Sequence, residues 1–324
     1  MAKIYNWGII GLGNIAHKFA HDLQLVRDAN LYGVASRSIE KAREFGKTYK
    51  STKSYGSYEK LLSDPHIDVV YIATPHAYHC ELALEAMDAG KAVLCEKPFG
   101  MDRVEVEKLI TKSKEKKVFL MEALWTRFIP ATEKLLSLLE SNIIGELKSV
   151  RADFGFNAVF EPEKRLFKKE LGGGSLLDIG IYPIFISLLT LGVPTEIKAL
   201  ATMFPSNVDS SCSMIFGYNS NESAVLDASL LTDTPIVCWL HGTKGSLKMS
   251  NPFHSTKEIS FFKDRELVET YNLEYTGLGY YHEILDVQES LKQGKIESEK
   301  LPLSFSLDLI TIMDKVRKEI DLNY

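Results

Sequence analysis

Cysteine is scarce in this sequence and does not occur at disulfide or metal-ligand spacing. The 324 residues contain four cysteines, Cys80, Cys95, Cys212 and Cys238, with no C-x-x-C pair. This pattern indicates neither a disulfide framework nor a zinc knuckle. Because histidines, cysteines and carboxylates also fail to gather at metal-ligand spacing, we expect no metal site.

Basic stripes and long apolar runs are missing as well. The net charge of -5 and the absence of a dense Lys/Arg stripe argue against nucleic acid as a partner. No uninterrupted apolar stretch approaches the ~20 residues that span a bilayer, and no basic-then-apolar signal region precedes the first strand. We therefore expect a soluble, cytoplasmic protein that binds neither nucleic acid nor membrane.

The first part of the chain alternates between apolar strands and amphipathic helices. With 45% hydrophobic and 25% charged residues, the composition is that of a globular protein long enough for two domains. Strands are predicted at 4–10, 31–35, 67–73, 92–95 and 118–122, and helices at 15–26, 39–49, 58–63, 79–89 and 102–116. Such alternation predicts an α/β fold with a doubly wound parallel sheet over residues 1–122.

A glycine-rich turn follows the first predicted strand directly. It reads Gly11-x-Gly13-x-x-Ala16 and runs into a helix. Gly11 allows the tight turn, Gly13 lets the backbone approach a pyrophosphate, and Ala16 lets the helix pack closely on the strand. The N–H groups of Asn14 and Ile15, at the helix N-terminus, would face the phosphates. This context predicts dinucleotide binding, with an ordinary βα turn as the alternative.

The end of the second predicted strand discriminates between cofactors. An acidic residue here would hold the ribose 2′-hydroxyl of NAD. The sequence instead has Ser36 and Arg37, with Lys41 one turn further on. A hydroxyl and a guanidinium bind a 2′-phosphate through charge-assisted hydrogen bonds, whereas a carboxylate would repel it. These residues favour NADP over NAD, with a solvated arginine at a helix start as the alternative.

The stretch 93–100, Val-Leu-Cys-Glu-Lys-Pro-Phe-Gly, is the most specific motif. It resembles the Gfo/Idh/MocA oxidoreductase family, which carries Glu-Lys-Pro after the fifth strand. The segments 73–79 and 89–93 lie at the family's usual distance upstream. Within that family, the segments 122–128 and 172–182 resemble the dimeric dihydrodiol dehydrogenases and their bacterial relatives.

This resemblance implies a two-domain NAD(P)-dependent oxidoreductase. Residues 1–122 would form the Rossmann domain, and residues 123–324 an α/β domain with an open, mostly antiparallel sheet for substrate binding and homodimer formation. The helix predicted at 304–321 could pack on the first domain. The sequence of this second part predicts strands independently of the resemblance. Apolar and polar residues alternate over 150–156, as in a half-buried strand. Further apolar runs bounded by turn residues predict strands at 196–204, 212–218, 223–231, 236–241, 245–249 and 258–263.

The resemblance also implies further cofactor contacts. The residues concerned are Thr74, Pro75, His79, Glu96, Lys97, Trp125 and Arg127. From the residues alone, His79 could equally be a structural histidine. Trp125 and Arg127 could form an interdomain cation–π pair, which would not exclude a position over the cofactor.

Hydride transfer to or from a carbinol carbon needs a group that moves the hydroxyl proton. Asp178 and Tyr182 are four residues apart on a predicted helix and share one face. Many sugar-oxidising relatives have histidine where this chain has Tyr182. Because the pKa of tyrosine is about 10, a cation such as Lys97 would have to lower it for Tyr182 to act near neutral pH. We expect Tyr182 as acid/base, Lys97 as its modulator and Asp178 as an orienting group; the reverse, with Lys97 as acid/base, stays open.

Together these features predict an NADP-dependent oxidoreductase for a secondary alcohol, a diol or a sugar-like carbonyl. Trp125, Phe154 and Phe156 could form an aromatic wall for the substrate, although the two phenylalanines could also be sheet core. One alternative is a sugar or amino-sugar dehydrogenase that uses NAD. Another is a non-catalytic NAD(P)-binding regulator, against which the presence of the Lys97, Asp178 and Tyr182 set argues.

Overall fold

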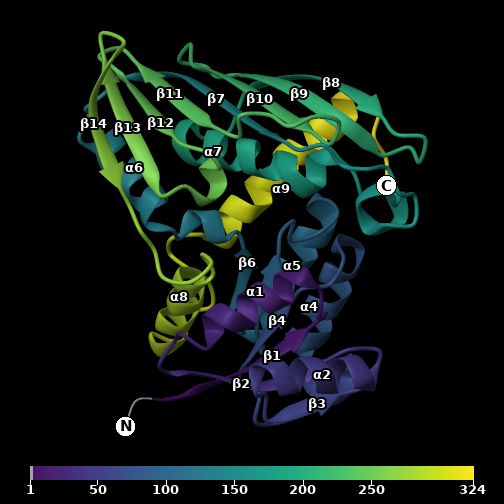
Figure 1. Ribbon diagram of the computed structural model, residues 1–324. Coiled ribbons are helices and arrows are strands. Elements are labelled where there is room, and N and C mark those ends of the chain that lie inside the picture. Colours follow the sequence, from purple (N-terminus) through teal and green to yellow (C-terminus); the bar gives the residue numbers. More distant parts are fainter. Residues whose placement is uncertain (1–2) are drawn as a thin grey trace. The chain divides into compact units, whose positions relative to one another are not determined.

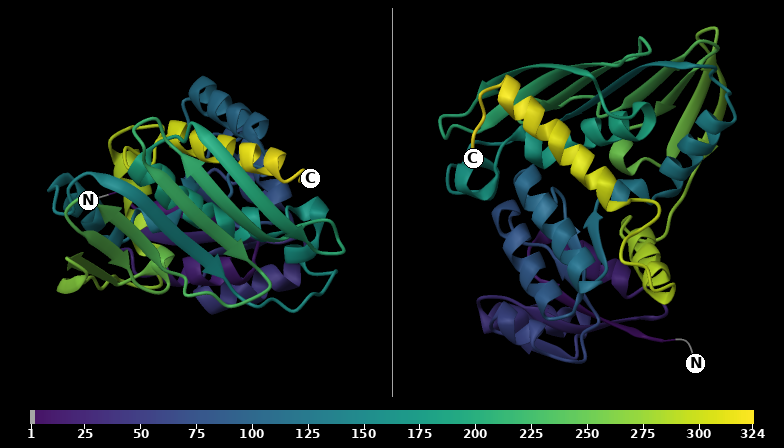
Figure 2. Two further views of the ribbon diagram at one scale, coloured as in Figure 1. Left: turned by 90° about the horizontal axis from the view of Figure 1, so that it is seen from above. Right: turned by 180° about the vertical axis from the view of Figure 1, so that it is seen from behind.

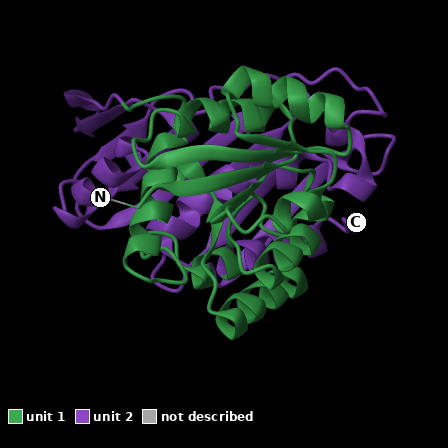
Figure 3. Ribbon diagram, turned by 90° about the horizontal axis from the view of Figure 1, so that it is seen from below, with its two compact units in different colours: residues 1–128, 275–307 green, residues 129–274, 308–324 purple. Residues whose placement is uncertain are grey.

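The computed structural model describes residues 3–324 and divides the chain into two compact units. Unit 1 contains residues 1–128 and 275–307, and unit 2 contains residues 129–274 and 308–324 (Figure 3). Each unit is therefore built from segments that are far apart in the sequence.

Unit 1 is built on a six-stranded parallel sheet with the order β3-β2-β1-β4-β5-β6 (Figure 1). Strands β4 and β5 are buried along their whole length, as expected where helices cover both faces of a sheet. The predicted Rossmann-type sheet is confirmed, with β3 as a strand that the sequence did not reveal. The strands are β1 (Tyr5–Ile10), β2 (Ala29–Ala35), β3 (Lys53–Tyr55), β4 (Val69–Ile72), β5 (Ala92–Glu96) and β6 (Leu120–Ala123).

Side chains cap several of the helices between these strands. Ser38, Ser57 and Asp102 each accept a hydrogen bond from the backbone N–H three residues further on, at the starts of α2, α3 and α5. These caps explain why the helix starts could be predicted closely. The helices are α1 (Asn14–Leu23), α2 (Ile39–Tyr49), α3 (Tyr58–Leu62), α4 (His79–Asp88) and α5 (Arg103–Lys116).

A helix from late in the chain, α8 (Tyr281–Lys292), also belongs to unit 1. Asp22, fully buried on α1, accepts hydrogen bonds from the backbone N–H groups of Leu278, Tyr280 and Tyr281. One buried carboxylate thus fastens the start of α8 to the first helix of the chain. The last helix, α9 (Leu303–Glu319), begins in unit 1 and continues in unit 2.

Unit 2 contains an eight-stranded sheet with the order β14-β13-β12-β11-β7-β10-β9-β8 (Figure 2, left). Its pairings are antiparallel except that β7 and β10 run parallel, so the predicted mostly antiparallel sheet is confirmed. The strands are β7 (Leu147–Gly155), β8 (Glu196–Met203), β9 (Asp209–Gly217), β10 (Ser223–Ser229), β11 (Cys238–Gly242), β12 (Ser246–Met249), β13 (Glu258–Lys263) and β14 (Glu266–Asn272).

A π-helical turn (Leu176–Gly180) and α7 (Ile181–Leu191) pack on β7 and β10, while α6 (Pro130–Glu140) packs on β13. The segment Lys169–Leu191 is long and apolar enough to cross a membrane by length and composition. However, 78% of its most apolar window is buried inside the protein, as in the core helix of a globular unit. We therefore interpret this segment as the core of unit 2.

Candidate active site

The glycine-rich turn lies at the carboxyl end of β1, beside the point where the strand order reverses between β1 and β4. Gly11 has φ of +87°, and a Cβ atom there would lie 2.7 Å from the backbone of Ala73. By contrast, apart from its neighbours in the chain, no described atom comes within 4 Å of a Cβ built at Gly13, and Gly13, the N-cap residue of α1, has no side chain to cap the helix. The open space over the backbone N–H groups at the start of α1, those of Asn14 and Ile15, fits a pyrophosphate.

A buried hydroxyl lies at the end of the neighbouring strand β4. Thr74 Oγ1 is buried and has no hydrogen-bond partner among the described residues. The fully buried ring of His79 places Nε2 2.8 Å from the Thr74 carbonyl oxygen and Nδ1 2.8 Å from the Pro98 carbonyl oxygen. His79 therefore ties the end of β4 to the loop after β5, and the Thr74 hydroxyl fits a bound cofactor. Contacts of Pro75 and His79 with it stay predictions.

Ser36 and Arg37 lie in the loop after β2, and Lys41 lies in the first turn of α2. Ser36 is half-buried and accepts a hydrogen bond from the Ser38 N–H at 3.2 Å, whereas Arg37 and Lys41 are exposed. The Arg37 charge lies close enough to Tyr58 to lower that residue's pKa, against a larger rise caused by burial. A hydroxyl and two exposed cations at this place suit a 2′-phosphate, and their contact with it stays a prediction.

Two buried carboxyl groups hold the loop that carries Lys97. Glu96, only 6% exposed, accepts hydrogen bonds from the Tyr71 hydroxyl at 2.5 Å and from the Lys97 N–H at 3.2 Å. Glu122 Oε1 accepts the Phe99 N–H at 3.0 Å, and burial raises the pKa of Glu122 to about 7. The peptide bond after Lys97 is cis. The hydrogen bonds to Glu96 and Glu122 fix the backbone on both sides of Lys97. Contacts of Glu96 and Lys97 with the cofactor stay predictions.

Trp125 and Arg127 lie in the turn after β6 and are both buried. The Trp125 ring stacks on Tyr280, with ring centroids 5.2 Å apart. Arg127 Nε donates to the Lys300 carbonyl oxygen at 2.8 Å. Both side chains therefore have structural partners inside unit 1, and their contact with the cofactor stays a prediction.

In unit 2, the structure replaces the predicted regular helix around Asp178 with a π-helical turn. Asp178 lies within that turn and Tyr182 is the second residue of α7. Asp178 Oδ1 accepts a hydrogen bond from Arg165 Nη2 at 2.6 Å. Sequence reasoning missed Arg165, which belongs to a short 3₁₀ helix (Arg165–Phe167) and has no local motif to mark it. Such π-helical turns occur frequently at functional sites.

Aromatic rings surround Tyr182, which is only 6% exposed. Its ring centroid lies 5.6 Å from that of Phe154 and 4.9 Å from that of His254. Phe154 and His254 stack with centroids 4.5 Å apart. Phe154 and Phe156 also pack against a buried apolar cluster, so Phe154 is both sheet core and a neighbour of Tyr182. His254 had no sequence signal.

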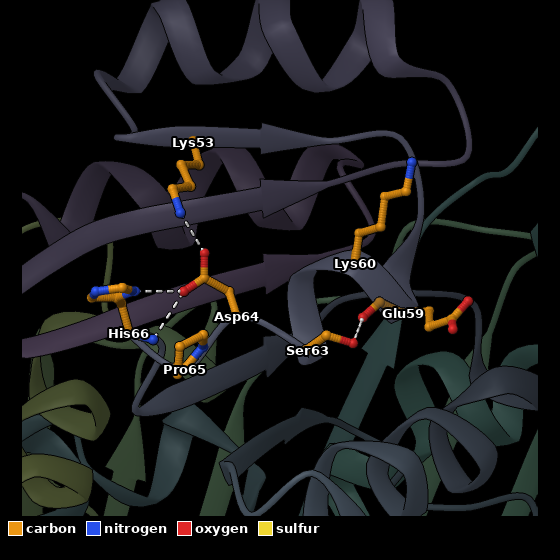
Figure 4. A pocket seen from close by; sticks show the side chains of 7 residues that line it. All are labelled: Lys53, Glu59, Lys60, Ser63, Asp64, Pro65 and His66. Atoms are coloured by element: carbon orange, nitrogen blue, oxygen red, sulfur yellow. Dashed lines mark hydrogen bonds and ion pairs between the residues drawn. The ribbon is translucent and has the colours of Figure 1, made fainter.

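A surface pocket elsewhere on unit 1 is lined by residues of a hydrogen-bond network that stabilises the fold (Figure 4). Its centre is Asp64, whose carboxylate accepts hydrogen bonds from Lys53 Nζ at 2.6 Å, the Tyr55 hydroxyl at 2.7 Å and the His66 N–H at 2.9 Å. Lys53 begins β3 and Tyr55 ends it, while Asp64 and His66 precede the amino end of β4, which is opposite the glycine-rich turn. Across residues 3–324, no group of three or more His, Cys, Asp or Glu side chains could hold a metal ion.

Comparisons with known proteins identify the family. Over 98% of its length, the chain is 34% identical to a trans-1,2-dihydrobenzene-1,2-diol dehydrogenase from Xenopus tropicalis, covering 98% of that protein. Residues 5–124 match the family model "Oxidoreductase family, NAD-binding Rossmann fold", and residues 132–248 match the "GFO/IDH/MocA C-terminal domain". The chain belongs to the Gfo/Idh/MocA oxidoreductase family. It is an NAD(P)-dependent oxidoreductase that acts on CH–OH groups, as the motifs predicted.

Further relatives are of the same kind. The human trans-1,2-dihydrobenzene-1,2-diol dehydrogenase is 33% identical, over 98% of this chain and 97% of its own. Among solved structures, the 3-ketoreductase KijD10 from Actinomadura kijaniata, in complex with NADP and TDP-benzene, has a TM-score of 0.88 at 25% identity, with 98% of each chain covered. An aldose-aldose oxidoreductase from Caulobacter crescentus shares the fold, with a TM-score of 0.89 at 20% identity over 99% of this chain and 98% of its own.

Proposed function

We propose that this protein is an NADP-dependent oxidoreductase that interconverts the secondary alcohol and the carbonyl form of a diol. The observation that carries the diol is the aromatic set of Phe154, Tyr182 and His254, which suits a flat, largely apolar substrate next to a proton-transferring hydroxyl. The full-length similarity to dihydrodiol dehydrogenases supports the same substrate class. In this proposal residues 1–122 bind the cofactor, and residues 123–324 bind the substrate.

The cofactor is NADP. Ser36, Arg37 and Lys41 offer one hydroxyl and two cations at the carboxyl end of β2, where an NAD enzyme would place a carboxylate. The similar 3-ketoreductase KijD10 has been solved with NADP. Gly11, Gly13, Asn14, Ile15 and Thr74 would hold the pyrophosphate side through backbone N–H groups and the buried hydroxyl.

The bound nicotinamide supplies the hydride acceptor or donor. Tyr182 takes the substrate hydroxyl proton during oxidation and returns it during reduction, since its Oη belongs to a buried ring whose position the neighbouring rings fix. The Lys97 ammonium favours the tyrosinate and binds the substrate oxygen. Asp178, held by Arg165, orients the hydroxyl group. The converse assignment, with Lys97 as the acid/base, makes Tyr182 a hydrogen-bond donor to the same oxygen.

A panel assay tests this function. Purified protein is incubated with NADP⁺ and trans-diols, aldoses or inositols, and with NADPH and dicarbonyls or ketosugars, while absorbance of the reduced cofactor is followed. We expect turnover with a diol, and an NADP preference over NAD. Turnover confined to sugars with NAD would favour a sugar dehydrogenase, and no turnover with any substrate would favour a cofactor-binding regulator.

A sugar-like carbonyl is the second candidate substrate. The 3-ketoreductase KijD10 was solved with TDP-benzene, and this chain is 25% identical to it over 98% of its length. The Asp178–Arg165 pair could bind sugar hydroxyl groups. Higher kcat/KM for a ketosugar than for any diol in the panel would select this candidate.

We further propose a homodimer that forms through the sheet of unit 2. Leu200 on β8 is 81% exposed and Ile215 on the neighbouring β9 is 57% exposed, and both lie on the same face of the sheet. Exposed apolar side chains of this kind commonly mark an interface. Light scattering after size exclusion should give twice the chain mass, and the double variant Leu200→Glu/Ile215→Glu should give one chain mass. A wild-type monomer would contradict the dimer.

We also propose that the protein is soluble and lies in the cytoplasm. All four cysteines, Cys80, Cys95, Cys212 and Cys238, are buried free thiols in the structure. Such cysteine usage is typical of reducing compartments. Fractionation of cells that express the native protein, followed by immunoblotting, tests the location; recovery in a membrane fraction would contradict it.

A further inference from the structure

A buried aspartate from the sheet of unit 2 holds the start of the turn that carries Asp178. Asp209 is the first residue of β9 and is fully buried. Its Oδ2 accepts hydrogen bonds from the Ser175 hydroxyl at 2.5 Å and from the Leu176 N–H at 2.6 Å. Ser175 and Leu176 are the residues from which the π-helical turn begins, so this carboxyl group fixes where the turn starts.

The glycine run before the turn is shaped to let Asp209 approach. Gly174 has φ of +108°, and a Cβ atom there would overlap Asp209 Oδ1. A Cβ atom at Gly173 would lie 2.6 Å from the Leu166 carbonyl oxygen. The Gly174 N–H also donates to that Leu166 carbonyl at 2.9 Å, beside Arg165, the partner of Asp178. Gly173 and Gly174 are therefore packed between Asp209 on one side and the 3₁₀ helix of residues 165–167 on the other.

The other carboxylate oxygen of Asp209 is left without a partner. Oδ1 is buried and accepts no hydrogen bond from any described residue. A buried acceptor without a partner costs about 1–3 kcal/mol. Burial raises the pKa of Asp209, and the Ser175 and Leu176 donors lower it in part. Asp209 therefore lowers the stability of the fold at Oδ1, while its Oδ2 holds the turn that carries Asp178. Residues that break a folding rule in this way often do so because a functional site needs them.

We infer that Asp209 is a positioning residue for the acid/base site: by fixing Ser175 and Leu176 it sets the places of Asp178 and Tyr182. The inference rests on the proposed function of those two side chains. Asp209 itself is fully buried and acts through the turn, not by contact with the substrate.

Kinetics of two Asp209 variants test this role. Asp209→Ala removes the acceptor, and we expect kcat to fall about 10- to 100-fold, as for a small displacement of a catalytic group. The KM for NADPH should stay within about 2-fold, because the cofactor loops of unit 1 are untouched. Asp209→Asn keeps an acceptor oxygen and should restore kcat to within about 3-fold of wild type. Unchanged kcat in folded Asp209→Ala would overturn the inference.

The control variant Leu247→Ala separates positioning from general loss of stability. Leu247 lies on β12, is fully buried in unit 2, and is not part of the apolar cluster that contains Ile179 of the π-helical turn. We expect it to lower the melting temperature while kcat per folded molecule stays at the wild-type value. If Leu247→Ala lowers kcat as much as Asp209→Ala does, the effect is one of stability and the inference fails.

Hydrogen exchange gives a readout that needs no substrate. Amides of residues 176–182 should exchange faster in Asp209→Ala than in wild type, whereas amides of β13 should not change. If the wild type has no activity, the proposed function is wrong. The exchange result still shows whether Asp209 holds the π-helical turn in place. If Asp209→Ala does not fold, Ser175→Ala removes one of the two contacts, and unchanged exchange at 176–182 together with unchanged kcat would overturn the inference.

Discussion

The buried carboxyl group of Glu122 makes a quantitative prediction about stability and pH. Glu122 is 2% exposed at the end of β6, and burial raises its pKa from 4.5 in the unfolded chain to about 7. Between these values the folded protein holds a proton that the unfolded chain has released. Stability should therefore fall as the pH rises from about 4.5 to 7, because above pH 7 the folded state must bury a charge.

The variant Glu122→Gln removes this titration. Its amide oxygen can still accept the Phe99 N–H that Glu122 Oε1 accepts at 3.0 Å. A pKa difference of about 2.5 units corresponds to about 3.4 kcal/mol at 1.36 kcal/mol per unit. Because part of this change occurs below pH 5, the variant should gain about 2–3 kcal/mol relative to wild type between pH 5 and pH 8. Any constant cost of the buried amide group cancels in this comparison. The difference between two pH values is thus a better measure than either stability alone.

Urea unfolding at pH 5, 6, 7 and 8, followed by tryptophan fluorescence, measures the gap, that is, the free energy of unfolding of the variant minus that of the wild type at each pH. Glu115→Gln, on the exposed side of α5, controls for the change in net charge and should leave the gap near zero. A Glu122→Gln gap that does not widen with pH would refute the reasoning, since it would mean that Glu122 is ionised in the folded protein at pH 5.

Three further predictions concern the cofactor, the acid/base pair and the glycine run. Arg37→Ala should weaken NADPH binding about 10-fold or more and NADH binding little, because a charge-assisted contact to the 2′-phosphate is lost; titration calorimetry with both cofactors measures this, and equal losses would contradict it. Lys97→Met should lower kcat about 10²-fold or more while NADPH still binds, if the ammonium supports proton transfer; kcat near wild type would contradict that role. Gly174→Ala should destabilise unit 2 by about 2–4 kcal/mol because of backbone strain and overlap with Asp209. Gly192→Ala, where φ is positive but a Cβ meets open space, should cost only the backbone strain, about 1–3 kcal/mol, in the same thermal melts; a larger loss for Gly192→Ala than for Gly174→Ala would contradict the overlap.

Local patterns predicted most of the Rossmann unit. The helix predicted at 39–49 is α2 itself, because Ser38 caps its start and Lys50 ends it in a left-handed conformation. The strand β3 was missed because it has three residues and lies half-exposed at the sheet edge, so it has no apolar run. The strand β14 was missed for a related reason: six of its seven side chains are exposed, and no alternation marks it.

Contacts between distant residues lay beyond sequence reasoning. Asp22 holds the segment before α8 across more than 250 residues of chain, and nothing in the local sequence of either segment indicates this. The same holds for the site. Motifs pointed to Asp178 and Tyr182, but Arg165, His254 and Asp209 gain their roles only from tertiary packing around them. The π-helical turn was also hidden, because the periodicity of 172–191 is that of an ordinary buried helix.

Deuterium transfer tests the central proposal most directly. NADPH carrying deuterium at both hydrogen positions of nicotinamide C4 is incubated with the carbonyl form of the diol that the panel selects, and the product is analysed by mass spectrometry. Wild-type protein should place one deuterium on the new carbinol carbon, and Tyr182→Phe should bind NADPH equally well but form product at least ~10²-fold more slowly. No deuterium in the product, or equal rates for the two proteins, would contradict the proposed NADP-dependent chemistry at Tyr182.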